Sequence, residues 1–120
     1  METNIMEQME ALQTLAQFND RLLKNLPTVI DELVSNRKPD TDVYLKNIID
    51  VIGWEISVIN ATSSLLGRAK THMDKENFNR SVLALNEALS SGTDSGIAAS
   101  LQELLPHFET LKAAVTEALA

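Results

Sequence analysis

Glu103 and His107 come closest, by type and spacing, to residues that could bind a metal ion. They are four positions apart, so on a helix both side chains lie on the same face. Di-iron helical bundles use a different pattern, with Glu-x-x-His on two helices and one further Glu on each of the other two. The chain contains no Glu-x-x-His. We therefore expect no metal site and no cofactor.

Residues for nucleophilic catalysis do not occur in a recognisable arrangement. The absence of cysteine excludes thiol catalysis and thiolate zinc sites. The serines and threonines form no nucleophile elbow, and only two histidines are present to activate them. We therefore predict that the protein is not an enzyme. The alternative, a small-ligand or metal-binding helical bundle with an enzymatic role, needs inward-facing carboxylates or histidines on at least three helices. The sequence offers Glu55 and Glu103.

Two polar residues fall on apolar patterns. Asn19 lies on the apolar stripe of the first third of the chain, and Glu55 lies nearly on the stripe of the second predicted helix. If the two side chains meet, one polar pair could fix the register of two helices. We favour this structural role over a catalytic one, because a carboxylate without a partner acid, nucleophile or metal has nothing to act on.

Three aromatic residues are candidates for binding a partner. Trp54 is the only tryptophan, follows Gly53 within a helical pattern and lies off the main apolar stripe. It is either a boundary residue with its indole N–H in water or an exposed anchor, since tryptophan is enriched among interface hot spots. Phe18 and Tyr44 belong to secondary apolar rows beside the main stripes. We predict that Trp54, Tyr44 and Phe18 form the partner-binding surface.

The elements that position these residues follow from the apolar spacing. Intervals of four and three alternate at two places, which indicates helices packed lengthwise against other helices. In the first third the positions are Ile5, Met9, Leu12, Ala16, Asn19, Leu23, Leu26, Ile30 and Leu33. In the last quarter they are Ile97, Leu101, Leu104, Phe108, Leu111, Val115 and Ala118.

We predict an all-α fold, an antiparallel four-helix bundle with long first and last helices. The first helix begins near Thr3 or Asn4, both good N-caps, and runs to about residue 35. Pro27 interrupts it and either kinks or ends it, with a kink favoured because the apolar stripe continues on both sides. The second helix runs from Asp42 to about residue 66, and Gly67 either ends it or is passed through.

The third predicted helix has the strongest start signal. Asp74 at the N-cap places apolar residues at both ends of a hydrophobic staple, and Gly92 stops the helix. Thr93 or Asp94 caps the fourth helix, which runs nearly to residue 120. Pro106 interrupts it as a proline interrupts the first helix, so a kink is expected there too.

The composition fits one domain spanning residues 1–120, because this length encloses a single core and 44% of the residues are apolar. The formal net charge of −7 disfavours nucleic-acid binding. No apolar stretch approaches the ~20 residues that span a bilayer, and Met1 to Asn4 lack the basic start of a signal peptide. We therefore expect a cytoplasmic protein that binds neither nucleic acid nor membrane.

Basic residues gather in one segment of this acidic chain. Five of the twelve Lys, Arg and His residues lie between positions 68 and 80: Arg68, Lys70, His72, Lys75 and Arg80. The segment is either a solvated connection between helices or a docking patch for an acidic partner.

One stretch of the sequence resembles a known group of proteins. The segment DKENFNRSVLALNEAL at residues 74–89, with a later Leu-Leu-Pro at 104–106 and an earlier lone Trp54, is similar to small uncharacterised helical proteins of Bacillus- and Listeria-type bacteria. This resemblance implies a cytosolic four-helix bundle of a Gram-positive bacterium and brings no assigned activity. As a class, the chain is also similar to flagellar and type III export chaperones, which are acidic, cysteine-poor and helical.

These features together predict a non-enzymatic protein–protein interaction module. It would be an adaptor or an export-chaperone-like bundle that binds another protein through an apolar groove or an exposed helix face. The apolar rows of the first two predicted helices are wider than one seam requires. The surplus should therefore be covered either by a protein partner or by a second copy of the chain in a homodimer.

Overall fold

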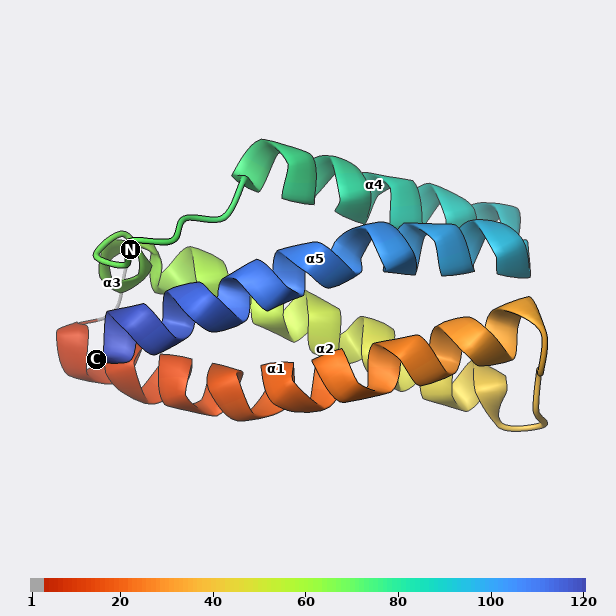
Figure 1. Ribbon diagram of the computed structural model, residues 1–120, viewed down its shortest axis with the longest axis horizontal. Coiled ribbons are helices and arrows are strands. Elements are labelled where there is room, and N and C mark those ends of the chain that lie inside the picture. The colour runs from red at the N-terminus through yellow and green to blue at the C-terminus, as the bar shows by residue number, and fades with distance from the viewer. Residues whose placement is uncertain (1–3) are drawn as a thin grey trace.

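The computed structural model describes residues 4–120, in which all regular structure is helical (Figure 1). This part of the chain forms five helices: α1 (Ile5–Val34), α2 (Thr41–Ala61), α3 (Ser63–Leu66), α4 (Lys75–Ser91) and α5 (Asp94–Leu119). The all-α prediction is confirmed, whereas the number of helices is five and not four. No helix within residues 4–120 combines the length and the apolar character needed to cross a bilayer.

The predicted second helix is divided at Thr62, which is a correction to the prediction. α2 begins one residue before Asp42 and ends at Ala61. The hydroxyl of Thr62 donates to the Val58 carbonyl at 2.6 Å, the same acceptor that the Thr62 N–H uses at 3.0 Å. Such competition for a backbone carbonyl bends helices. Thr62 has φ −116° and ψ 21°, and α3 follows it as a separate single turn.

A buried glutamine of α1 supports α3. Gln8 is 3% exposed, and its Oε1 accepts a hydrogen bond from the Leu65 N–H at 3.1 Å. This N–H belongs to the first turn of α3, where backbone donors have no partner within the helix. Gly67 follows the last residue of α3, so the helical stretch ends there rather than passing through the glycine.

Cap residues named from the sequence lie at the helix ends. Asn4 and Asp74 each accept a hydrogen bond from the backbone N–H three residues later, at 2.9 and 3.1 Å. Gly92 ends α4 with φ 76°, a left-handed conformation that glycine adopts without strain. Thr3, the other predicted cap of the first helix, lies outside the described residues.

α1 and α5 continue without interruption through Pro27 and Pro106. Both prolines are exposed on the outer side of their helices. A proline has no N–H and crowds the carbonyl four residues earlier, and on the outer side water can hydrate that carbonyl. Neither proline therefore ends its helix.

The long helices lie lengthwise beside one another, and the chain reverses direction from α1 to α2 and from α4 to α5 (Figure 1). α1 packs against α2 and α5, and α4 packs against α5. Within residues 4–120, α2 makes no close backbone contact with α4 or α5, so α1 is its only long neighbour. The described residues span 43 × 24 × 24 Å.

The core follows α1 and α5, because most of the large, fully buried side chains belong to these two helices. They are Leu12, Leu15, Asn19, Leu26, Val29, Leu101, Leu104, Phe108, Leu111 and Val115. The predicted stripe of the first helix is only partly correct, since Ile5 and Met9 are each 38% exposed. The buried face of α1 is therefore centred between the predicted stripe and the row beside it.

Candidate interaction site

A cleft of about 290 Å³ lies between α1 and α2, and we call it the aromatic cleft. Eight residues line it: Phe18, Arg21, Leu22, Asn25, Tyr44, Asn47, Ile48 and Val51. The four positions on each helix recur at spacings of three and four, so each set forms one helix face. Leu22 and Ile48 are buried and form the apolar floor, whereas Asn25 and Asn47 bring amide groups.

Phe18 and Trp54 join α1 to α2 at one end of the aromatic cleft. Their ring centroids are 5.1 Å apart and their planes meet at 60°, an edge-to-face arrangement that aromatic pairs favour. Trp54 is 38% exposed. Among the described residues no group accepts a hydrogen bond from its indole N–H. The indole therefore presents both an apolar surface and an available donor to solvent.

Tyr44 lies on the wall that α2 contributes to the aromatic cleft. It is half-buried, and its hydroxyl donates to the Asn25 carbonyl of α1 at 3.5 Å, a long hydrogen bond. Burial raises the pKa of Tyr44, and the negative charge of Glu32 acts in the same direction. The phenol therefore stays neutral at pH 7 and keeps its proton for hydrogen bonding.

Arg21 is the cation of the aromatic cleft. Its guanidinium carbon lies 5.4 Å from the centroid of the Phe18 ring, within the range of a cation–π interaction. No carboxylate in residues 4–120 forms an ion pair with Arg21. Arg21 is absent from the sequence-based prediction, although its spacing of three residues from Phe18 places both side chains on one helix face.

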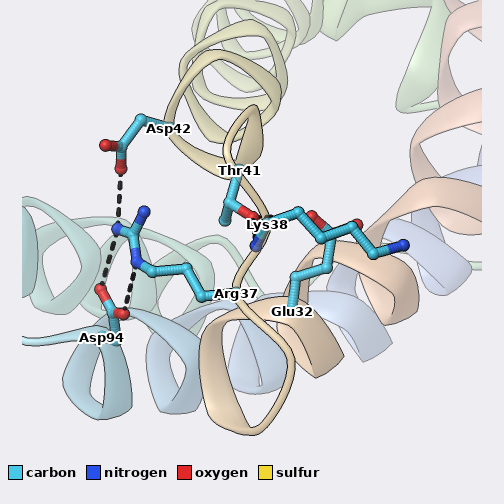
Figure 2. Close-up of polar contacts among 6 residues, drawn as sticks. All are labelled: Glu32, Arg37, Lys38, Thr41, Asp42 and Asp94. Atoms are coloured by element: carbon cyan, nitrogen blue, oxygen red, sulfur yellow. Dashed lines mark hydrogen bonds and ion pairs between the residues drawn. The ribbon is translucent and has the colours of Figure 1, made fainter.

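Ion pairs hold the connection between α1 and α2 at the end of the molecule where α5 begins. Figure 2 shows the Arg37 guanidinium between two carboxylates. Nε and Nη2 of Arg37 donate to Asp94 at 2.9 and 3.3 Å, and Nη2 donates to Asp42 at 2.7 Å. The bond from Arg37 lowers the pKa of Asp94. These groups are exposed, so water weakens their attraction, and they position the connection more than they stabilise the fold.

A buried threonine completes the same connection (Figure 2). Thr41 is fully buried, and its hydroxyl donates to Oε1 of Glu32 at 2.8 Å. The Thr41 hydroxyl also accepts from the Lys38 N–H at 2.8 Å. These bonds tie the end of α1 to the start of α2 and thereby fix how the two walls of the aromatic cleft face each other.

The predicted polar pair of Asn19 and Glu55 does not form, which is a second correction. Both side chains are buried, at 1% and 0% exposure. Asn19 Nδ2 instead donates to the Phe108 carbonyl of α5 at 3.0 Å. Within the described residues, Oδ1 of Asn19 and both carboxyl oxygens of Glu55 lack hydrogen-bond partners. Burial raises the pKa of Glu55 to about 8, so this carboxyl is uncharged at pH 7.

Glu103 and His107 face a shallow groove between α5 and α4 rather than the core. His107 is half-buried, and its ring lies edge-to-face with the Phe78 ring, with the two ring centroids 5.7 Å apart. In residues 4–120 no group of three or more His, Cys, Asp or Glu side chains is placed to hold a metal ion. The structure therefore brings together the three predicted aromatic residues, and it places the two candidate metal ligands elsewhere.

Residues 10–114 match the sequence profile of a family described as Domain of unknown function (DUF8042). Because the match covers most of the chain, the protein belongs to this family. The comparisons with curated proteins and with solved structures find no match to the chain. The family description names no activity.

Proposed function

We propose that this member of the family is a non-enzymatic protein–protein interaction module, in which the four long helices form an antiparallel bundle that presents the aromatic cleft to a partner protein. The observation that supports the proposal is the distribution of aromatic residues. The chain has three Phe, one Tyr and one Trp, which makes five. Phe78 and Phe108 are buried, whereas Phe18, Tyr44 and Trp54 gather at one cleft where part of their surface is exposed. Aromatic residues are enriched among interface hot spots.

The shape and chemistry of the aromatic cleft suit a helical segment of a partner. A groove between two helices accepts the apolar side of a third helix, as in other helix-in-groove complexes. The Arg21 guanidinium offers the partner a site for one carboxylate, and Asn25 and Asn47 offer hydrogen bonds at the edges. This arrangement suits an adaptor or an export-chaperone-like holder, and we propose that it acts in the cytosol of a Gram-positive bacterium.

Capture of partners from an extract of the native host tests the proposal. Phe18→Ala removes the ring that contacts both Trp54 and Arg21. Leu83→Ala is the matched control, because Leu83 is a 62% exposed apolar residue on α4. We expect the wild type and Leu83→Ala to retain the same protein at the same stoichiometry, and Phe18→Ala to lose it. Equal retention by all three variants would contradict the proposal.

A second copy of the chain is the competing occupant of the aromatic cleft. Light scattering of the purified protein distinguishes the two cases, because a homodimer has twice the mass of the monomer. If Phe18→Ala converts a dimer to a monomer, the cleft serves self-association. A monomeric wild type favours a foreign partner. Stoichiometric iron, manganese or zinc that survives dialysis would instead support a metal-binding bundle with an enzymatic role.

A further inference from the structure

A second pocket, of about 230 Å³, lies at the opposite end of the molecule from the ion pairs of Arg37. α4 begins only at Lys75, so on the side that α4 covers further along, the C-terminal part of α5 faces α3 and the connection between α3 and α4 (Figure 1). The pocket lies beneath this connection, and we call it the connection pocket. It offers room for roughly eight groups of the ~30 Å³ that a water molecule occupies in the liquid.

The inner wall of the connection pocket is apolar. Ile59 from α2 and Ala114 from α5 are 6% and 3% exposed and line it from two sides. Met73 from the connection is half-buried and lines a third side. The unbranched side chain of methionine adapts to guests of different shape. The interior therefore suits a short hydrocarbon group.

The connection above the pocket is fastened at a defined point. The N–H and the hydroxyl of Thr71 both donate to the carboxylate of Glu117 in α5, at 2.6 and 2.8 Å. These two bonds lower the pKa of Glu117, which therefore stays ionised at neutral pH. Ala69, two residues earlier, is buried. The connection is thus held beside the pocket rather than collapsed into it.

Lys75 brings a positive charge to the mouth of the connection pocket in a chain of net charge −7. His72 and Lys75 line the mouth and are exposed. Across the described residues, neither side chain forms an ion pair with a carboxylate. Lys75 has an acidic residue on each side in the sequence. Asp74 caps α4 through its bond to the Asn77 N–H, and Glu76 forms an ion pair with Arg80 at 2.6 Å. An anion at the mouth would therefore meet the ammonium group of Lys75, which forms no ion pair in the described residues.

We propose that the connection pocket binds a small organic anion with an apolar tail, of the class of short-chain carboxylates. The tail occupies the space between Ile59, Met73 and Ala114, and the carboxylate lies at the mouth beside Lys75. Hexanoate has eight non-hydrogen atoms and matches the available room. For so few atoms, a dissociation constant in the millimolar range is expected. This site is independent of the aromatic cleft.

Titration of the methyl-labelled protein with hexanoate, followed by NMR, tests the proposal. We expect shifts of the Ile59 and Met73 methyl signals and none of Ile30 and Ile97, which lie toward the other end of the molecule. Hexylammonium, which has the same tail and the opposite charge, should bind about tenfold more weakly. Inorganic phosphate alone should leave the apolar methyl signals unchanged.

Two charge-reversal variants distinguish a local contact between hexanoate and Lys75 from an effect of the overall charge on hexanoate binding. Lys75→Glu should weaken hexanoate binding about tenfold, and it is compatible with the fold because acidic residues are favourable in the first turn of a helix. Lys24→Glu changes the net charge equally at an exposed position of α1 and should bind hexanoate as the wild type does. Absence of shifts at Ile59 and Met73 would overturn the proposal. Equal binding of hexanoate and hexylammonium, or equal loss in both variants, would overturn it too.

Discussion

Replacing Glu55 by glutamine should stabilise the protein at pH 7. Glu55 is fully buried without a hydrogen-bond partner in the described residues, and its pKa rises from an ordinary 4.5 to about 8 on folding. Between these two values the unfolded chain has released the proton and the folded chain still holds it. The unfolded state then binds fewer protons, so the free energy of unfolding falls as the pH rises.

The magnitude follows from the size of this pKa difference. Each pH unit between the two pKa values costs about 1.4 kcal/mol, so at pH 7 the wild type has lost about 3 kcal/mol relative to an uncharged side chain of the same shape. Glutamine is neutral in both states and avoids this loss. We therefore expect Glu55→Gln to raise the free energy of unfolding at pH 7 by about 3 kcal/mol, with little change near pH 4.5.

Urea denaturation at pH 5, 6, 7 and 8, followed by circular dichroism, measures the effect. The wild type should lose about 1.4 kcal/mol per pH unit up to pH 7 and less as the pH approaches 8, and Glu55→Gln should be nearly flat. Asp94 and Glu117 do not interfere, because their pKa values are lowered and their contributions are lost only at more acidic pH. Glu103→Gln, at an exposed position of α5, is the control and should keep the wild-type slope. Parallel curves for the wild type and Glu55→Gln would refute the reasoning.

Three further predictions concern packing and positioning. Leu26→Ala removes a fully buried side chain and should cost about 2–5 kcal/mol, whereas Trp54→Ala should cost less because the indole is 38% exposed; urea denaturation checks the order, and the reverse order would make Trp54 a core residue. Arg37→Ala should lower the melting temperature slightly, by less at high salt, because its ion pairs are exposed; a salt-independent loss would contradict this. Glu117→Gln should speed amide exchange at Thr71 while global stability changes little, and unchanged exchange would show that the two bonds do not hold the connection.

The fold was largely predictable because its signals are local. Capping by Asn4 and Asp74 needs only one polar side chain before a helical pattern. The end of α4 at Gly92 needs only a residue without a Cβ, which adopts the left-handed conformation without strain. The break at Thr62 was not predictable, because the apolar spacing continues across it. There the choice between a straight and a divided helix depends on one hydroxyl that donates to Val58 and on Gln8, which is distant in the sequence and bonds to the first turn of α3.

The candidate site was predictable residue by residue but not as an assembly. Spacing placed Phe18 and Tyr44 in rows beside the main stripes, yet it gives only the direction of a side chain around its own helix. Which helix lies opposite depends on tertiary packing, so the cleft between α1 and α2 required the structure. The same limit explains the failed pair of Asn19 and Glu55, since Asn19 turns to a backbone carbonyl of α5.

The one-sided attachment of α2 and of α4 implies an order in which the molecule comes apart. Among the helices in residues 4–120, α2 has close backbone contact only with α1 and α3, and α4 only with α5, so the detachment of either breaks fewer contacts than that of α1 or α5. Local opening requires the least free energy where an element makes few contacts with the rest of the protein. We expect the amides of α2 and of α4 to exchange with solvent through opening events that leave α1 and α5 packed together. A ligand bound between α1 and α2 would then oppose the detachment of α2 from α1.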